Sequence, residues 1–215
     1  MLSQRTIKNK ITCSGVGLHT GKKVKLTFHP AEPNTGILFR RIDGDKVVDI
    51  PATAKNVGET TLSTTLVYGD YKISTIEHLL SALAGTGVDN CIIDCDGPEI
   101  PIMDGSSTQF VFLIQTAGIV EQNAVKKFVY VTKSVQVQRD DAVARIKPYD
   151  GFRVTFTLEF DHPVYNKYPH SASIDFSQTS FIREVSRART FGLMDDLEKL
   201  KKMNLALGAN LNNAI

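Results

Sequence analysis

The order of strand-like and helix-like segments is the feature that most constrains what this chain can fold into. In each half of the 215 residues, segments that alternate apolar and polar side chains precede segments with helical periodicity. This order differs from the regular strand–helix alternation of parallel folds, and it predicts α+β layers. The polar segment 121–127 separates the halves, so we expect one domain over 1–124 and a second over 125–215.

The strand pattern is clearest in residues 22–29, where Val24, Leu26 and Phe28 alternate with polar side chains. Such alternation predicts a strand with one buried face. The same reasoning gives a hairpin turn at 68–70 between two extended segments. The further strands expected are 36–42, 47–52, 90–95, 128–138, 142–149, 152–160 and 171–176, and the helices are 74–85, 107–117, about 177–188 and 194–204.

Composition excludes several classes of partner. The net charge is +2 and no basic cluster is interleaved with aromatic side chains, so we expect no nucleic-acid binding. The N-terminus lacks the apolar core of a signal peptide, and the apolar runs are far shorter than the ~20 residues of a membrane span. We therefore expect a cytoplasmic protein with at most peripheral membrane contact.

The three cysteines, Cys13, Cys91 and Cys95, form no short paired motif, which is typical of a reduced intracellular chain. Cys91 and Cys95 lie four residues apart on a predicted strand, so their side chains share one face. We interpret both as buried core thiols.

The helix at 74–85 carries adjacent Glu77 and His78, and two interpretations of the glutamate stay open. Ser74 followed three residues later by Glu77 fits a capping box, in which the glutamate is structural. A carboxylate beside a histidine also suits a catalytic base next to a metal ligand. The local sequence does not choose between the two.

The periodicity of this helix places His78 away from its apolar stripe. The stripe consists of Ile76, Leu79, Leu80 and Leu83, and the opposite face carries Ser81, Ala82 and Gly85 beside His78. A face of small uncharged residues differs from a solvated helix face. The histidine is therefore expected either to be packed under another layer or to face a cavity.

The segment 15–23, GVGLHTGKK, looks like a glycine-rich phosphate loop but does not meet the dinucleotide-binding pattern. Thr20 stands where the third glycine would fall, and a strand follows where that fingerprint requires a helix. A glycine hairpin explains the glycines. It leaves His19 and Thr20 at the tip, with Lys22 and Lys23 behind them, as candidates for contact with an anionic substrate.

Other polar candidates also have structural explanations. Asp104 precedes a helix whose N-cap is expected at Ser106 or Ser107. Arg187 and Arg189 fit cations at a helix C-terminus. The sequence shows no complete zinc site, because none of the other histidines forms a ligand pair at helical spacing. These histidines are His19, His29, His162 and His170.

Four motifs together resemble one enzyme family. They are GVGLHTG (15–21), STIEHLLSALAG (74–85), DGPEIPIMDGSS (96–107) and SRARTFG (186–192). In this order and over the whole chain, they are similar to the UDP-3-O-acyl-N-acetylglucosamine deacetylases, zinc amidases that commit Gram-negative bacteria to lipid A synthesis. The resemblance implies two β-α-α-β domains whose helices pack between the sheets of the two halves, with the second domain incomplete here. It also implies hydrolysis of the N-acetyl group of an acylated UDP-N-acetylglucosamine, which gives acetate and a free amine.

The resemblance further implies roles for individual residues. Glu77 is implied to be the general base, His78 to be a zinc ligand and Thr190 to help bind the oxyanion. The other positions implied to contact substrate are Leu18, His19 and Leu62 at the border of the site, Glu159 and Phe160 toward the uridine, and Phe191, Leu197 and Leu207 along the acyl chain.

Two departures from the family pattern matter. Ser63 stands where some members have a cysteine near the metal, so a second metal held by that thiol is not expected. The family's other zinc ligands, a His and an Asp, and its general-acid His belong to a segment that this sequence lacks after Ile215. We therefore expect a chain that is C-terminally truncated relative to the family and inactive by itself. The alternative is a non-catalytic fragment or sugar-nucleotide-binding module of the same fold, and a monomer is expected in either case.

Overall fold

A five-stranded sheet forms the base of the molecule in the computed structural model, which describes residues 2–159, 163, 165–177 and 180–214. The strand order is β2-β3-β8-β4-β5, with β4 and β8 parallel and the other neighbours antiparallel. The strands are β2 (Ile11–Val16), β3 (Lys23–Pro30), β4 (Ile37–Asp43), β5 (Lys46–Pro51) and β8 (Cys91–Cys95).

The alternating pattern of β3 explains why one face of this sheet is buried. Val24, Leu26 and Phe28 are at most 2% exposed, whereas Lys23 and Lys25, which alternate with them, are exposed. Cys91 and Cys95 lie on the same buried face of β8, which confirms their interpretation as core thiols. Desolvation raises the pKa of the Cys91 thiol to about 12 and that of the Cys95 thiol to about 11.

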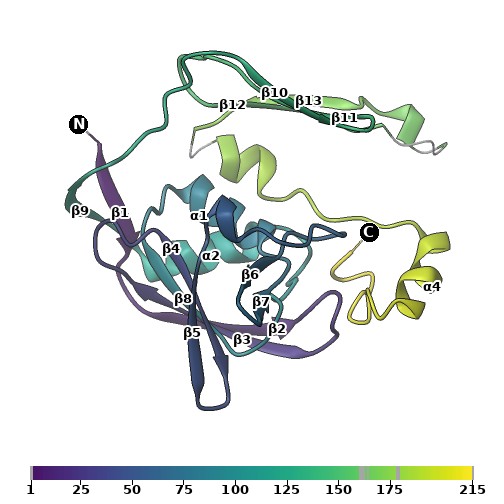
Figure 1. Ribbon diagram of the computed structural model, residues 1–215, viewed down its shortest axis with the longest axis horizontal. Coiled ribbons are helices and arrows are strands. Elements are labelled where there is room, and N and C mark those ends of the chain that lie inside the picture. The colour runs from purple at the N-terminus through teal and green to yellow at the C-terminus, as the bar shows by residue number, and fades with distance from the viewer. Residues whose placement is uncertain (1, 160–162, 164, 178–179, 215) are drawn as a thin grey trace.

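Helices α1 (Glu77–Thr86) and α2 (Thr108–Ala117) pack against each other over the buried face of the sheet, as Figure 1 shows. Both predicted helices are therefore confirmed, although α1 begins three residues later than Ser74. Gly87 ends α1 in the left-handed conformation, which glycine adopts without a steric penalty. Gly118 follows the last turn of α2, also at positive φ.

Two short strand pairs flank this layer. The expected hairpin at 68–70 is confirmed, with β6 (Leu66–Tyr68) paired to β7 (Tyr71–Ile73). Strand β1 (Ser3–Ile7) pairs with β9 (Ile119–Val125), so most of the polar segment at 121–127 belongs to a strand. The division into domains at 124/125 stays a prediction. A short turn of helix, η1 (Ala54–Asn56), connects β5 to β6.

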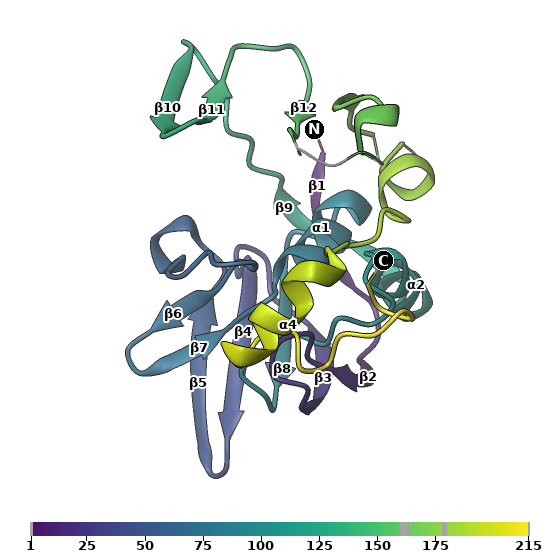
Figure 2. The ribbon, with the colours of Figure 1, turned by 90° about the vertical axis from the view of Figure 1, so that its right-hand side faces the viewer.

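The second half consists of two hairpins followed by short helices. Its elements are β10 (Val135–Arg139), β11 (Ala142–Ile146), β12 (Arg153–Thr157), η2 (Tyr165–Lys167), β13 (Ser171–Asp175), η3 (Phe181–Val185) and α4 (Met194–Lys202). Of the helix expected over about 177–188, the described residues show a helical residue at Ser180 and the short element η3, while residues 178–179 lie outside the described residues. The hairpins β10–β11 and β12–β13 lie on the side of α1 that faces away from the five-stranded sheet (Figures 1 and 2).

The alternating pattern of the second-half strands does not produce a buried face in β10, β11 or β12. Every residue of β10, β11 and β12 is exposed, including Phe156 at 63%. The mixture of sheets and helices confirms the α+β class. Over the described residues, no helix has the length and apolar character needed to cross a membrane.

Candidate functional site

The start of α1 is shaped by a backbone that cannot form the predicted capping box. Thr75 has a φ of 57°, a left-handed conformation that costs on the order of 1–3 kcal/mol for a branched residue. The chain therefore enters the helix abruptly at Ile76, and no side chain caps the first turn. The capping interpretation of Glu77 is wrong.

The carboxylate of Glu77 is instead directed at the neighbouring loop. Its Oε2 accepts the backbone N–H of Thr64 at 3.0 Å. Within the described part of the chain, this is the one hydrogen bond made by that carboxylate, so lone pairs remain available to accept a proton. The glutamate is half-buried, which suits a group that exchanges protons with a bound molecule.

His78 lies next to this carboxylate in a partly desolvated position. Burial lowers the pKa of its imidazole below the usual value of 6.5, while the nearby charges of Glu77 and Asp104 oppose that shift. At neutral pH the ring is therefore uncharged, and one of its nitrogens carries a free lone pair. The helix is held here by Ser107, whose hydroxyl donates to the carbonyl of His78 at 3.0 Å.

One residue on the small face of α1, Gly85, packs against the second half of the chain. A Cβ placed on Gly85 would overlap the ring of Phe181, which is 2% exposed and belongs to η3. At Gly85 this face packs under another layer, whereas the two alternatives for His78 itself, packing or a cavity, both stay predictions. This contact places η3 against the C-terminal part of α1.

The segment after η3 is joined to the loop before α2, and this brings Thr190 to the site. The N–H of Thr190 donates to the carbonyl of Gly105 at 2.8 Å, and the N–H of Ser107 donates to that of Ser186 at 3.1 Å. Gly105 adjoins Asp104, whose charge acts on His78. The backbone of Thr190 is thereby linked to the loop beside the Glu77–His78 pair.

Two expectations for these loops have different outcomes. The N-cap of α2 is Ser107, one of the two predicted positions, although its own side chain makes no capping hydrogen bond; the hydroxyl of Ser106 accepts the N–H of Thr108 at 3.1 Å instead. The interpretation of Arg189 as a helix-terminal cation is wrong. Its guanidinium donates to the carbonyls of Asp104, at 2.7 Å, and Leu211, at 3.3 Å, so it ties the two loops together.

The glycine-flanked loop at 17–21 gathers four of the predicted substrate residues. The carbonyls of Leu18 and His19 accept the N–H groups of Gly208, at 2.9 Å, and Leu207, at 3.1 Å. The imidazole of His19 accepts the N–H of Ala206 at Nδ1. Its Nε2 must then carry the proton, which it donates to the carbonyl of Leu62 at 3.4 Å. Leu18, His19, Leu62 and Leu207 therefore form one cluster.

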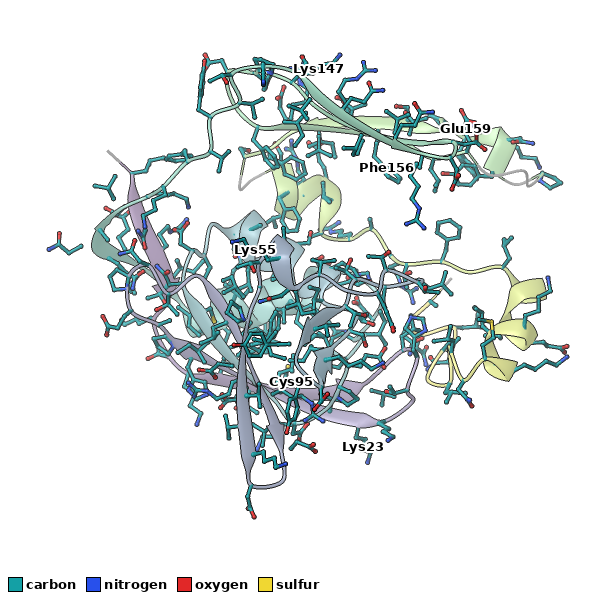
Figure 3. All side chains as sticks on the ribbon, in the orientation of Figure 1. Lys23, Lys55, Cys95, Lys147, Phe156 and Glu159 are labelled. Atoms are coloured by element: carbon teal, nitrogen blue, oxygen red, sulfur yellow. The ribbon has the colours of Figure 1, made fainter. Side chains whose placement is uncertain are left out.

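The remaining predicted substrate residues belong to other segments of the chain. Phe191 is 46% exposed and its ring lies 6.4 Å from that of Tyr165. Leu197 is half-buried in α4. Glu159 is exposed in the hairpin layer (Figure 3), and Phe160 lies outside the described residues. An apolar groove does occur elsewhere, on α2, where Met103, Phe112 and Leu113 line it.

Sequence reasoning missed Glu99, which is fully buried beneath the His19 loop. Its carboxylate accepts hydrogen bonds from the N–H groups of His19 and Thr20, both at 2.8 Å. The available signal was a single charged residue within the otherwise apolar segment PEIPI at 98–102. Charged residues are rarely fully buried without partners, so a charge in such a segment indicates that donors lie around it.

The donor set around His78 is too small to hold a metal by itself. His78 has the neutral imidazole that zinc prefers. Among the residues that the structure describes, however, no three His, Cys, Asp or Glu side chains are grouped closely enough to hold a metal ion. The described residues alone therefore do not fit a zinc site.

In the first half of this α+β chain, the Glu77 carboxylate has lone pairs that can accept a proton, and it lies beside the neutral imidazole of His78. This pair of groups is typical of a hydrolytic enzyme. The model of the family described as UDP-3-O-acyl N-acetylglycosamine deacetylase matches residues 4–215. A UDP-3-O-acyl-N-acetylglucosamine deacetylase of Methylococcus capsulatus is 59% identical over the whole chain, which covers 71% of that relative. Relatives with the same description from Coxiella burnetii are 55% identical with the same coverage. The chain belongs to this deacetylase family.

Proposed function

We propose that this chain takes part in removing the N-acetyl group from UDP-3-O-acyl-N-acetylglucosamine, a step of lipid A biosynthesis. Water adds to the acetamide carbonyl carbon, the carbon–nitrogen bond breaks, and acetate and a free amine result. Membership of the deacetylase family and the descriptions of the relatives support this substrate class. They favour it over the alternative of a sugar-nucleotide-binding module without catalysis.

Glu77 is the general base of this proposal. The observation that carries the assignment is the position of its carboxylate, which makes no helix cap and accepts a single N–H from Thr64 in the described structure. A base so placed takes the proton of the attacking water and typically contributes 10²–10⁴-fold to the rate. Thr190 supplies a hydroxyl for the oxyanion, supported by its backbone contact with Gly105.

The substrate contacts of the proposal are divided between two groups. Leu18, His19, Leu62 and Leu207 border the reacting centre, supported by the hydrogen bonds that gather them. Phe191 and Leu197 are proposed to line the acyl chain, and Glu159 and Phe160 to contact the uridine. For these four positions the support is the family pattern alone.

The cofactor and the cellular context belong to the same proposal. We assign Zn²⁺ as the cofactor with His78 as one ligand, because burial keeps that imidazole neutral. We place the protein in the cytoplasm as a monomer. Because the proposed substrate carries an acyl chain, the proposal includes at most peripheral contact with a membrane surface.

The test is the rate of acetate release from UDP-3-O-acyl-N-acetylglucosamine by the full-length protein. Glu77→Ala should lower kcat by about 10²–10⁴-fold, because the water then loses its base. Glu121→Ala, which removes an exposed carboxylate from β9, should leave kcat within about twofold. Glu77→Ala activity close to that of the unaltered protein would refute the assignment of the base. If the protein releases no acetate from this substrate at all, the alternative of a binding module is favoured.

A further inference from the structure

Glu99 lies on a segment that joins two parts of the site. The segment around it, 98–102, runs between the chain before the His19 loop and the chain before α1. On one side the N–H of Ile102 donates to the carbonyl of Val16 at 3.0 Å. On the other, the N–H of Ile100 donates to the carbonyl of Ser74 at 2.9 Å. A side chain on this segment can therefore contact both parts.

The carboxylate of Glu99 makes both of these contacts. It accepts the N–H groups of His19 and Thr20 through different oxygens, each at 2.8 Å. It also accepts the hydroxyl of Thr75 at 3.1 Å. All three partners are donors, so both oxygens of the side chain act only as hydrogen-bond acceptors. The side chain is fully buried.

The residues on either side are built around this carboxylate. A Cβ on Gly17 would overlap Glu99 Oε2, so only glycine allows the loop to approach so closely. Thr75 has a left-handed backbone conformation two residues before Glu77. Such a strained conformation persists only where several surrounding contacts hold it. The hydrogen bond from Thr75 to Glu99 is one such restraint.

We infer that Glu99 is a positioning residue that fixes the His19 loop relative to the start of α1, and so sets the distance between His19 and the Glu77–His78 pair. This inference rests on the proposed function, in which His19 contacts substrate and Glu77 is the base. The carboxylate is held on both sides, and a displacement of about 1 Å at a reacting centre can cost about 10²-fold in rate.

The test is a double-mutant cycle in the full-length protein, with kcat/KM for the deacetylation measured throughout. Glu99→Gln keeps the shape but turns an NH₂ group toward a backbone N–H. In the otherwise unaltered protein, we expect Glu99→Gln to lower kcat/KM by about ten- to a hundredfold. In a His19→Ala background, we expect the same substitution to lower kcat/KM by less than about threefold. A residue that only stabilises the fold would lower kcat/KM by the same factor in both backgrounds, and that result would overturn the inference.

Two further measurements separate positioning from folding. In Glu99→Gln the backbone amide protons of His19 and Thr20 should move upfield in the NMR spectrum and exchange faster, because each loses a charge-assisted hydrogen bond. Unchanged amide shifts would also overturn the inference. Thr75→Val removes only one hydroxyl and should give a smaller loss of kcat/KM that is likewise coupled to His19. Glu121→Gln is the matched control on an exposed strand.

Failure of the proposed function gives a different pattern. If Glu77→Ala leaves turnover unchanged, the assignment of the base is wrong whatever Glu99 does. If Glu77→Ala abolishes turnover and Glu99→Gln does not lower kcat/KM, the base assignment stands and the positioning role is refuted.

Discussion

Strands β3 and β12 have the same alternating sequence pattern and opposite surroundings. Val24, Leu26 and Phe28 of β3 lie under α1 and α2 and are at most 2% exposed. Val154 and Phe156 of β12 are 41% and 63% exposed. Figure 3 shows Phe156 in the hairpin layer and Cys95 within the five-stranded sheet. Alternation therefore specifies a strand and the two faces of that strand, whereas burial depends on what covers one of them.

The site follows the same division. Glu77, His78 and Glu99 belong to the densely packed first half. The second half reaches the site through separate segments, anchored by Phe181 on α1 and by the hydrogen bonds of Thr190 and Leu207. The packing of the first half therefore holds Glu77, His78 and Glu99 in place. The contacts of the second half bring the other candidate residues, Thr190 and Leu207, to the site.

The largest difference in stability between the two regions should appear when one phenylalanine is truncated in β3 and one in β12. Phe28→Ala removes a fully buried ring and should lower the free energy of unfolding by about 3–5 kcal/mol, because a cavity remains in the core. Phe156→Ala removes an exposed ring and should cost less than about 1 kcal/mol. Urea unfolding of both variants measures this difference, and equal losses would show that the two strands are equally important to stability.

A more modest change is expected at the anchor between the two regions. Gly85→Ala places a methyl group against the ring of Phe181, and overpacking of this kind typically costs 1–3 kcal/mol. Alanine also favours a helix over glycine by about 1 kcal/mol, so the steric cost must exceed that gain. Gly192→Ala is the control, because no atom lies within 4 Å of the added Cβ.

The same variant can be tested without its partner ring. In a Phe181→Ala background, Gly85→Ala should become neutral or stabilising, since only the gain in helix propensity remains. Thermal unfolding of the two single variants and the double variant measures the coupling. Destabilisation of the same size in both backgrounds would show that Phe181 is not the cause.

A pH dependence of stability should arise in the first half alone, because all three cysteines lie there. Burial raises the pKa of Cys91 from 9.0 to about 12, so the folded protein keeps a proton that the unfolded chain loses. This contribution to stability is complete below pH 9.0 and decreases as the pH rises toward 12, by up to about 1.4 kcal/mol per pH unit. Unfolding of Cys91→Ala between about pH 9 and 10.5 should show a correspondingly shallower slope than the unaltered protein. Parallel slopes would mean that this thiol titrates normally.

Much of the secondary structure could be predicted from the sequence, because periodicity reports which side of an element is apolar. The strands around Leu26 and Cys91, the hairpin at 68–70 and both central helices followed from such local patterns. The capping box at Ser74 and Glu77 failed because Thr75 is left-handed, which the sequence pattern does not reveal.

The site was predicted only in part, for a physical reason. The Glu77–His78 pair is local in sequence. Its supports are not: the contacts of Glu99 with His19 and of Arg189 with Asp104 join residues about 80 positions apart. Such contacts are fixed by the tertiary fold, and a single sequence carries little sign of them beyond a charged residue in an apolar segment.

By this account, most of the free energy of unfolding comes from the packed core of the first half, and the hairpins β10–β11 and β12–β13 contribute little to it. Native-state hydrogen exchange of the backbone amides tests this division most directly, because it reports opening free energies segment by segment. We predict that the amides of β3 and β8 exchange only through global unfolding. Those of β10–β13 should exchange many times faster, because isolated two-stranded hairpins are marginally stable. Equal protection of the two regions would contradict this division.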